Sequence, residues 1–316
     1  MILQLSKKPP PIGGVTIHVQ RLMAAIKTQG ELQTELLDYS KEKNLRRIFK
    51  KIINSSIIHV HLTHKQYRLI LTVILRLLFK KVIITFHGKY NFSNQFDYLS
   101  LKLSNKAIVL NQYSYDKAIK ISNNISLIGA FIPPIEKEHT NTLNSSTLNS
   151  ITDLKKKYKH IFATNAYNIV FDNKGREIYG GSLLIDVFSK LHDEALIFSD
   201  PTGKYKEYLL NKYGALPKNI FFINYFHNYI EVIKAVDCTI RATTTDGDAL
   251  SVKESLYYKT DVICSTVVDR PKGSILYTGK EQLIERIQNF SSYKGQYSKY
   301  VYENNVEKII NEYYRL

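Results

Sequence analysis

The sequence predicts an α/β protein in which two doubly wound parallel sheets follow one another along the chain. Short, β-branched apolar runs alternate with helical patterns, which is typical of parallel strands joined by crossover helices. The 316 residues suffice for two ordinary domains. A polar stretch rich in Asn, Ser and Thr separates two such alternating series near the middle of the chain.

The first series opens with a strand at 2–5, a loop rich in proline and glycine, and a helix at about 16–28. Apolar runs bounded by polar residues predict further buried strands at 57–62, 82–86, 107–110 and 125–128. An apolar helix at 66–81 joins two of these strands.

The second series has predicted strands at 169–171, 195–198, 220–223, 238–240 and 261–264, and helices at about 280–290 and 303–314 end the chain. The expected organisation is an N-terminal domain (1–135), a linker (136–160), a C-terminal domain (161–300) and a last helix (301–316) that is free to cross back to the N-terminal domain. Ligands of doubly wound sheets bind outside the carboxyl ends of the strands, so we expect a cleft between the domains.

Charge divides the chain unevenly. Residues 1–130 carry 20 Lys and Arg against 6 Asp and Glu, whereas residues 131–316 carry 24 against 22. The N-terminal half should therefore seek an anionic surface. With 44% hydrophobic and 23% charged residues, the chain can bury a core and is not a disordered tail.

Several classes of protein are disfavoured. Cys238 and Cys264 cannot form a disulfide framework or a thiolate zinc site, which suits a reducing cytoplasm. We expect no signal peptide, because Lys7 and Lys8 follow only a short apolar stretch. The apolar run at 69–79 is shorter than the roughly 20 residues that span a bilayer.

Two helices carry the basic excess. In 44–53, apolar and basic residues occupy separate faces and Asn44 is a candidate cap, which favours docking on an anionic membrane surface over a solvated basic edge. In the next helix, Arg68, Thr72, Arg76 and Lys80 form one polar stripe, and we expect this helix to lie in the core. Nucleic acid is an unlikely partner, because no recognition motif is visible.

The first candidate site is Pro-Ile-Gly-Gly-Val at 11–15, between a strand and a helix. The amides of Gly13 and Gly14 could approach an anion at the helix N-terminus, although paired glycines often form only a tight turn.

The second candidate is His87, in Thr-Phe-His-Gly at the end of a strand. It could contact a substrate hydroxyl, or it could be a structural histidine. A metal site with His59, His61 and His64 is a weaker alternative, because no carboxylate or cysteine is close in sequence, and we expect no metal.

The third candidate begins at a strand end and enters a helix. Asp246, Gly247 and Asp248 lie in a polar loop, and Ser251 and Glu254 follow in the helix. Carboxylates accept hydrogen bonds well from vicinal sugar hydroxyls. A capped helix with acids on its surface is the plainer interpretation.

These strings resemble the retaining glycosyltransferases of family 4 (group 1), which have the GT-B fold of two Rossmann-like domains. That family has two acidic residues separated by seven others, as Asp246 and Glu254 are here, with Asp in the first place instead of Glu. Gly13-Gly14-Val15 matches its first-strand loop, 85–88 its strand end with histidine, and 125–134 its run into the linker. The resemblance covers nearly the whole chain.

The sequence departs from that family after the first strand of the second domain. Tyr179-Gly180 stands where the family has Lys-Gly, so Lys174, Arg176 and Arg241 compete as ligands of the donor diphosphate. Because Asp246 is shorter than Glu, the amides of Gly247 and Asp248 become the alternative ligands of the sugar.

The resemblance implies a hexosyl- or N-acetylhexosaminyl-transferase that needs no metal or other cofactor. It would move a sugar from a nucleotide-sugar donor to a saccharide acceptor with retention of configuration, with His87, Asp246 and Glu254 as catalytic residues. Together with the basic half, it predicts a lipid-linked acceptor in surface polysaccharide or lipopolysaccharide assembly, at the inner face of the cell membrane. The alternatives are a GT-B-like UDP-sugar epimerase and a non-catalytic basic module that binds membrane or nucleic acid.

Overall fold

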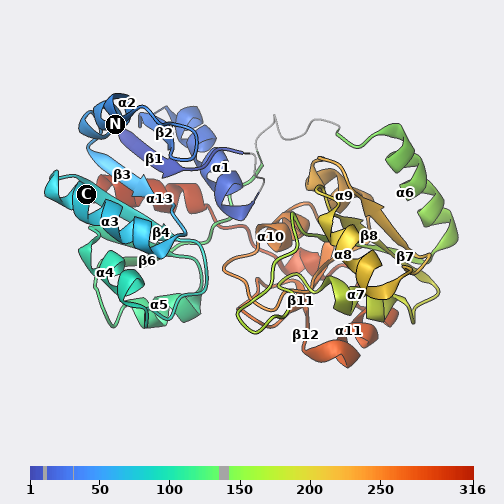
Figure 1. The fold of residues 1–316 in the computed structure, drawn as a ribbon. Helices are drawn as coiled ribbons and strands as arrows, with labels where there is room; N and C mark the ends of the chain where they lie inside the picture. Colours follow the sequence, from blue (N-terminus) through green and yellow to red (C-terminus); the bar gives the residue numbers. More distant parts are fainter. Residues whose placement is uncertain (10–12, 31, 135–141) are drawn as a thin grey trace. The chain divides into compact units, whose positions relative to one another are not determined.

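The computed structural model describes residues 1–9, 13–30, 32–134 and 142–316 (Figure 1). Pro11 and Ile12 of the glycine motif and the first residues of the expected linker lie outside these ranges. The chain forms two compact units, described below one at a time. The first unit comprises Met1–Ile135, Gly247–Ala249 and Glu303–Leu316, and the second comprises Glu136–Asp246 and Leu250–Tyr302.

The first unit contains a six-stranded parallel sheet in the order β2-β1-β3-β4-β5-β6. Its strands are β1 (Ile2–Ser6), β2 (Thr34–Asp38), β3 (Ile57–Val60), β4 (Lys81–Phe86), β5 (Lys106–Val109) and β6 (Ile125–Leu127). Its helices are α1 (Gly14–Gln29), α2 (Leu45–Ile53), α3 (Lys65–Leu77), α4 (Gln95–Leu103), α5 (Gln112–Ala118) and α13 (Asn305–Tyr314).

The second unit contains another six-stranded parallel sheet, in the order β12-β11-β10-β7-β8-β9. Its strands are β7 (His160–Asn165), β8 (Glu194–Ser199), β9 (Ile220–Ile223), β10 (Cys238–Arg241), β11 (Asp261–Ser265) and β12 (Ser274–Tyr277). Its helices are α6 (Ser145–Lys157), α7 (Gly181–Phe188), α8 (Lys204–Tyr213), α9 (Tyr229–Ala235), α10 (Leu250–Tyr257), α11 (Gly279–Gln288), α12 (Phe290–Tyr293) and the 3₁₀ turn η2 (Gln296–Lys299).

The two sheets confirm the predicted fold class, with differences in particular elements. The predicted strand at 169–171 is wrong: β7 takes its place as the central strand, and Phe171 makes only an isolated bridge to Glu177. Part of the expected linker forms α6. The edge strands β2 and β12 were not expected, because an edge strand pairs on one side only and can be short and partly polar.

The orientation of α3 is opposite to the one expected from its polar stripe. Arg68 and Thr72 are buried, whereas Ile70, Ile74 and Leu77 are exposed. The guanidinium of Arg68 pairs with Asp97, donates to the carbonyl oxygen of Leu62 at 3.0 Å and lies 4.6 Å from the ring centre of Phe86. The spacing of the residues correctly predicts a polar and an apolar side of this helix. The ion pair with Asp97 on α4 explains why the side with Arg68 faces the interior.

The C-terminal helix α13 belongs to the first unit, and Figure 1 shows it in red beside the blue strands. The hydroxyl oxygen of Tyr313 lies 2.7 Å from Nδ1 of His59 and accepts a hydrogen bond from Nε2 of Gln4 at 3.0 Å. Glu312 accepts from the hydroxyl of Ser126 at 2.7 Å and pairs with Lys106. The last helix therefore completes the buried polar interior of this unit.

Removing the hydroxyl of Tyr313 should destabilise the first unit. In Tyr313→Phe, the buried polar atoms of Gln4 and His59 lose a partner, so we expect the free energy of unfolding to fall by about 1–3 kcal/mol. Urea unfolding measures the change, and Tyr113→Phe, at an exposed tyrosine, is the matched control. Equal stability of the two variants would contradict this account.

Candidate functional site

The carboxyl ends of the parallel strands define where each unit can bind a ligand. Doubly wound sheets bind at the point where the strand order reverses. In the first unit this point lies between β1 and β3, and in the second between β7 and β10. The loops that follow these four strands, together with the end of β4, contain most of the candidate residues.

In the first unit, Gly13 and Gly14 lie at the N-terminus of α1, a helix of 16 residues with no acidic residue in its first turn. The amide of Gly13 donates to the hydroxyl of Thr16 at 3.1 Å. Among the residues that the structure describes, none has an atom within 4 Å of a Cβ added at Gly13. This N-terminus can therefore accept an anion.

His87 follows β4 and lies against two other histidines. Its Nε2 is 2.9 Å from Nδ1 of His61, and its ring is edge-on to that of His18. Burial lowers the pKa of His87 well below its ordinary value, and the neighbouring His18 and His59 lower it further. The ring is therefore neutral at pH 7 and can exchange a hydrogen bond with a sugar hydroxyl without carrying charge.

The histidines named as the weaker metal alternative do not come together as a set. Both ring nitrogens of His59 already have partners, Tyr313 and Thr85. His64 is exposed, precedes α3 and stacks on Tyr67. His61 instead lies with His18 and His87.

The polar loop after β10 is held in the first unit by two side chains. Nδ2 of Asn111 donates to the carbonyl oxygens of Gly88 and Gly247, both at 3.0 Å. The carboxylate of Asp248 accepts from the amide of Ala130 at 2.7 Å. A Cβ at Gly247 would lie 2.9 Å from Cα of Gly88, so only glycine fits there. Asn111 was not among the predicted site residues, although an Asn directly after a predicted strand is a recognisable helix cap.

In the second unit, Asp246 is enclosed by cations. Its carboxylate pairs with Arg241 and with Arg270, both at 3.1 Å, and accepts from the hydroxyl of Thr243. The side chains of Asp246 and Arg270 are only 8% and 2% exposed. Burial opposes ionisation of Asp246, but the two guanidiniums outweigh it and lower its pKa. This carboxylate is a structural anion whose acceptor sites are largely used.

Glu254 and Ser251 lie on α10, the helix that follows this loop. The side chain of Glu254 is buried, and its charge contributes to raising the pKa of Tyr229, after burial of the phenol itself. Glu254 thus lies on the inner side of α10, and the plainer interpretation of a surface acid does not hold.

Lys174 and Arg176 lie on a turn that is organised by Asp172. The carboxylate of Asp172 accepts from the backbone amides of both residues at 2.9 Å and pairs with the guanidinium of Arg176 at 2.7 Å. The hydrogen bond from the backbone amide of Arg176 makes the largest contribution to the lowered pKa of Asp172. The charge of Arg176 is thus shared with an acid on the same turn.

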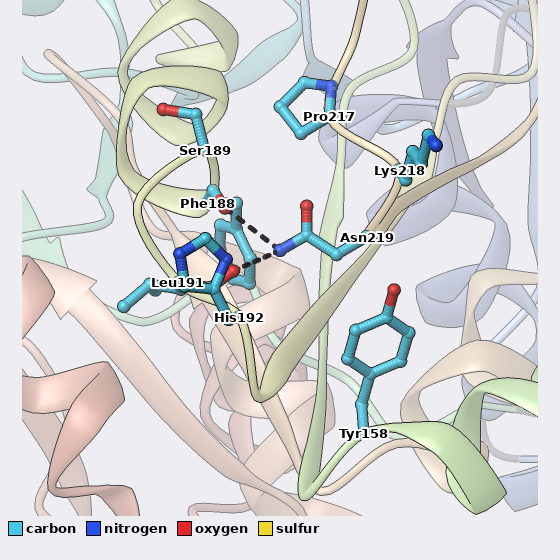
Figure 2. Close-up of a pocket in the computed structure, with 8 residues that line it drawn as sticks. All are labelled: Tyr158, Phe188, Ser189, Leu191, His192, Pro217, Lys218 and Asn219. Carbon is cyan, nitrogen blue, oxygen red and sulfur yellow. Dashed lines mark hydrogen bonds between the residues drawn. The ribbon is translucent and has the colours of Figure 1, made fainter.

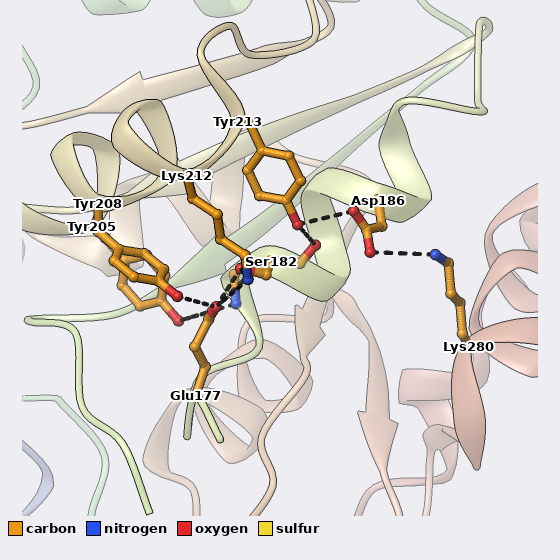
Figure 3. Close-up of polar contacts among 9 residues, drawn as sticks. Glu177, Ser182, Asp186, Tyr205, Tyr208, Lys212, Tyr213 and Lys280 are labelled. Atoms are coloured by element: carbon orange, nitrogen blue, oxygen red, sulfur yellow. Dashed lines mark hydrogen bonds and ion pairs between the residues drawn. The ribbon is translucent and has the colours of Figure 1, made fainter. Parts of the chain in front are cut away.

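The N-terminus of α7 is closed by the chain itself (Figure 3). Glu177 accepts from the amide of Ser182 at 2.9 Å and from the hydroxyls of Tyr205 and Tyr208 at 2.8 and 3.2 Å. The amide of Gly181 donates to Tyr205 at 3.1 Å. Because these groups are satisfied internally, the Tyr-Gly-Gly string before α7 offers no vacant anion site.

A depression of about 330 Å³ lies at the opposite edge of this sheet (Figure 2). Its lining residues precede β7, β8 and β9; they are Tyr158, Phe188, Ser189, Leu191, His192, Pro217, Lys218 and Asn219. Nδ2 of Asn219 donates to three carbonyl oxygens, those of Phe188, Leu191 and Glu194. The depression is therefore a gap between tied turns at the amino ends of the strands, away from the edge where ligands bind.

Comparison with solved structures establishes the fold over the full chain. Anabaena HepE in complex with UDP-glucose is 11% identical and covers 100% of both chains with a TM-score of 0.69. Sucrose-phosphate synthase from Thermosynechococcus elongatus is 14% identical, with a TM-score of 0.70 over 100% of this chain and 98% of its own. S. aureus MnaA with UDP is 12% identical, with a TM-score of 0.65 over 99% and 96%. The fold is GT-B, with two Rossmann-like domains.

Sequence comparison adds no family. No family model matches the chain, and no curated protein matches it.

Replacing Asp246 should destabilise the second unit. Asp246→Asn leaves two buried guanidiniums without their anion, so we expect a loss of about 3 kcal/mol in the free energy of unfolding at neutral pH. Because the pKa of Asp246 is lowered, this contribution is present above its ordinary value of 3.8 and is lost as the pH falls through the folded value.

Urea unfolding at a series of pH values measures the free energy of unfolding of wild type and variant. The difference between the two free energies should become smaller below pH 3.8. Asp153→Asn is the control, since that exposed acid pairs only with Lys156 on the same helix. If Asp246→Asn and Asp153→Asn lowered the free energy of unfolding equally, the ion pairs of Asp246 would not be what holds the loop.

Proposed function

We propose that this chain is a retaining glycosyltransferase that moves a hexosyl or N-acetylhexosaminyl group from a nucleotide sugar to a saccharide hydroxyl. The observation that supports this proposal most directly is the position of the segment from Asp246 to Glu254. In this GT-B fold the segment follows β10, next to the point where the strand order reverses. Structures of the same fold have been solved with UDP and UDP-glucose. A UDP-sugar is therefore the first donor to test.

The chemical requirement is to stabilise a departing diphosphate. We assign this role to the N-terminus of α1 and to Lys174 and Arg176, because preorganised positive charge and amide dipoles are large catalytic terms. Arg241 already balances Asp246 and should act mainly by holding the loop. No metal is required at the diphosphate in this scheme.

The remaining assignments follow from burial and charge. Glu254 accepts hydrogen bonds from the ribose hydroxyls. Neutral His87 and the amides of Gly247 and Asp248 contact the donor sugar, while Asp246 fixes the loop that presents those amides.

In the transfer step, the acceptor oxygen attacks the anomeric carbon on the face from which the phosphate leaves. The bond to the phosphate oxygen breaks, and that oxygen takes the proton of the acceptor hydroxyl. The configuration is retained without an enzyme nucleophile. This agrees with Asp246, whose carboxylate already accepts hydrogen bonds from Arg241, Thr243 and Arg270.

A thermal-shift screen against UDP, GDP, CMP and their sugar conjugates tests the donor site. A ligand at 100 times its dissociation constant should stabilise the fold by about 2.7 kcal/mol. Glu254→Gln should abolish the response to the active nucleotide, and Glu281→Gln, at an exposed acid on α11, should keep it.

No response to any nucleotide would favour the non-catalytic binding module. Interconversion of free nucleotide sugars without an acceptor would favour the epimerase.

The acceptor is proposed to be lipid-linked, because the first unit presents apolar side chains among basic ones. On α2, Leu45 and Phe49 are 79% and 57% exposed, and the basic residues Arg46 and Lys50, which follow them in sequence, are exposed as well. On and after α3, Leu77 and Phe79 are 72% and 95% exposed. No helix in the described residues is long and apolar enough to cross a bilayer.

One contact joins the two exposed elements. Nζ of Lys80, directly after Phe79, donates to the carbonyl oxygens of Ile53 and Ser55, at 2.7 and 3.0 Å, at the end of α2. The turn after α3 therefore lies against the end of α2. We call the exposed apolar residues of the two elements the α2–α3 surface; they are Leu45, Phe49, Ile53, Ile70, Ile74, Leu77 and Phe79. Apolar residues that enter the headgroup region beside cations that meet anionic lipid are typical of peripheral membrane binding.

Vesicle binding tests this proposal. The chain should sediment with vesicles that contain phosphatidylglycerol, less so at high salt, and weakly with phosphatidylcholine alone. Combining Phe49→Ser with Leu77→Ser should weaken binding at least 10-fold, because burying each side chain in lipid contributes on the order of 1.5–3 kcal/mol.

Leu148→Ser, at an exposed leucine on α6, is the control and should bind as wild type does. Undiminished binding by the double variant would refute the α2–α3 surface. Stronger retention by DNA than by vesicles would favour nucleic acid as the anionic partner.

A further inference from the structure

Three histidines from three different elements meet in the first unit. His18 lies on α1, His61 directly follows β3, and His87 directly follows β4. Strands β3 and β4 are parallel neighbours, so their carboxyl ends bring His61 and His87 together. Each ring places one nitrogen within 4.8 Å of the others.

The surrounding hydrogen bonds fix which nitrogens carry lone pairs. Nδ1 of His18 lies 2.7 Å from the carbonyl oxygen of Ala130 and must donate to it. Nε2 of His18 is then an acceptor, and this buried atom has no hydrogen-bond partner among the described residues. Nε2 of His61 donates to Oε1 of Gln4 at 2.9 Å, which leaves Nδ1 of His61 with its lone pair toward Nε2 of His87.

The same arrangement is found around histidines that bind metals. A ligating histidine almost always donates its second N–H to a carbonyl or carboxylate, which fixes the tautomer and the ring orientation. Here Ala130 and Gln4 supply those acceptors. His18 and His61 are each only 1% exposed, so water does not compete for their ring nitrogens.

We propose that His18, His61 and His87 form a binding site for one transition-metal ion of the Zn²⁺ type, with three imidazole ligands and an open fourth position. The ligating atoms are Nε2 of His18, Nδ1 of His61 and Nε2 of His87. Tetrahedral zinc with bonds of about 2.0–2.1 Å places its ligands about 3.4 Å apart. The contact of 2.9 Å between His61 and His87 must therefore open slightly, and His87 must move its proton to Nδ1.

From the sequence we expected no metal, so this proposed site departs from that expectation. The proposal does not depend on the proposed glycosyl transfer. The sequence signal was incomplete because His18 lies more than 40 residues from His61, on a helix that meets the strand ends only in the fold. Because His87 is also proposed to contact the donor sugar, bound metal should compete with that contact.

Metal titration of the chelator-treated chain, without nucleotide, tests the site. We expect one equivalent of Zn²⁺ by calorimetry and a tetrahedral absorption spectrum with Co²⁺ as the probe. His18→Ala should weaken binding at least 100-fold. Gln4→Leu, which removes the acceptor of His61 and the donor to Tyr313 but none of the three ligands, should weaken it about 10- to 100-fold. His64→Ala is the control and should bind as wild type does.

Circular dichroism establishes that each variant folds. If His18→Ala does not fold, His87→Ala replaces it, since that ring is only partly buried. Absence of saturable binding, or unchanged binding in the ligand variant, overturns the proposal. Neither result bears on the nucleotide screen, which can be run in the presence of chelator.

Discussion

Parallel pairing of every strand in the two described sheets is the constraint on which the molecule depends. Parallel strands need a crossover for each connection and a cover on both faces, so the inner strands are short, mostly apolar and almost fully buried. Pairing in one direction also collects all carboxyl ends at one edge of each sheet. Residues as distant in sequence as Gly13, His61 and His87 thereby reach the same edge of the first unit.

Inside the first unit, the same constraint concentrates polar groups around the central strands. Gln4 on β1 bonds to His61 and to Tyr313, and Tyr313 contacts His59, which contacts Thr85. Buried polar networks are stabilising only when their members are satisfied. The last helix is therefore part of this interior. Nε2 of His18, a buried atom without a hydrogen-bond partner in the part of the chain that the structure describes, is a chemically informative exception.

The chain uses its two kinds of cation differently. Arg68, Arg241 and Arg270 are turned inward, each with a carboxylate, because a planar guanidinium can satisfy several acceptors at once. Most lysines of the first unit remain on the surface. Turning Arg68 inward leaves the apolar face of α3 outside, beside the basic helix α2. The ion pair of Arg68 with Asp97 thus explains why the α3 part of the α2–α3 surface is exposed.

The sequence by itself determined the alternation of strands and helices, the basic first half, the Asn44 cap of α2 and the loop from Asp246 to Glu254, because each depends on neighbours along the chain. Only the tertiary structure decided which face of α3 is inside, that β7 and not 169–171 begins the second sheet, and that Glu177 closes α7. It also decided that Asp246 is held by Arg241 and Arg270, and that His18 joins His61 and His87. These outcomes depend at least in part on partners far away in sequence, such as Arg270 for Asp246 and Tyr205 for Glu177, whose contacts exist only once the strands have paired.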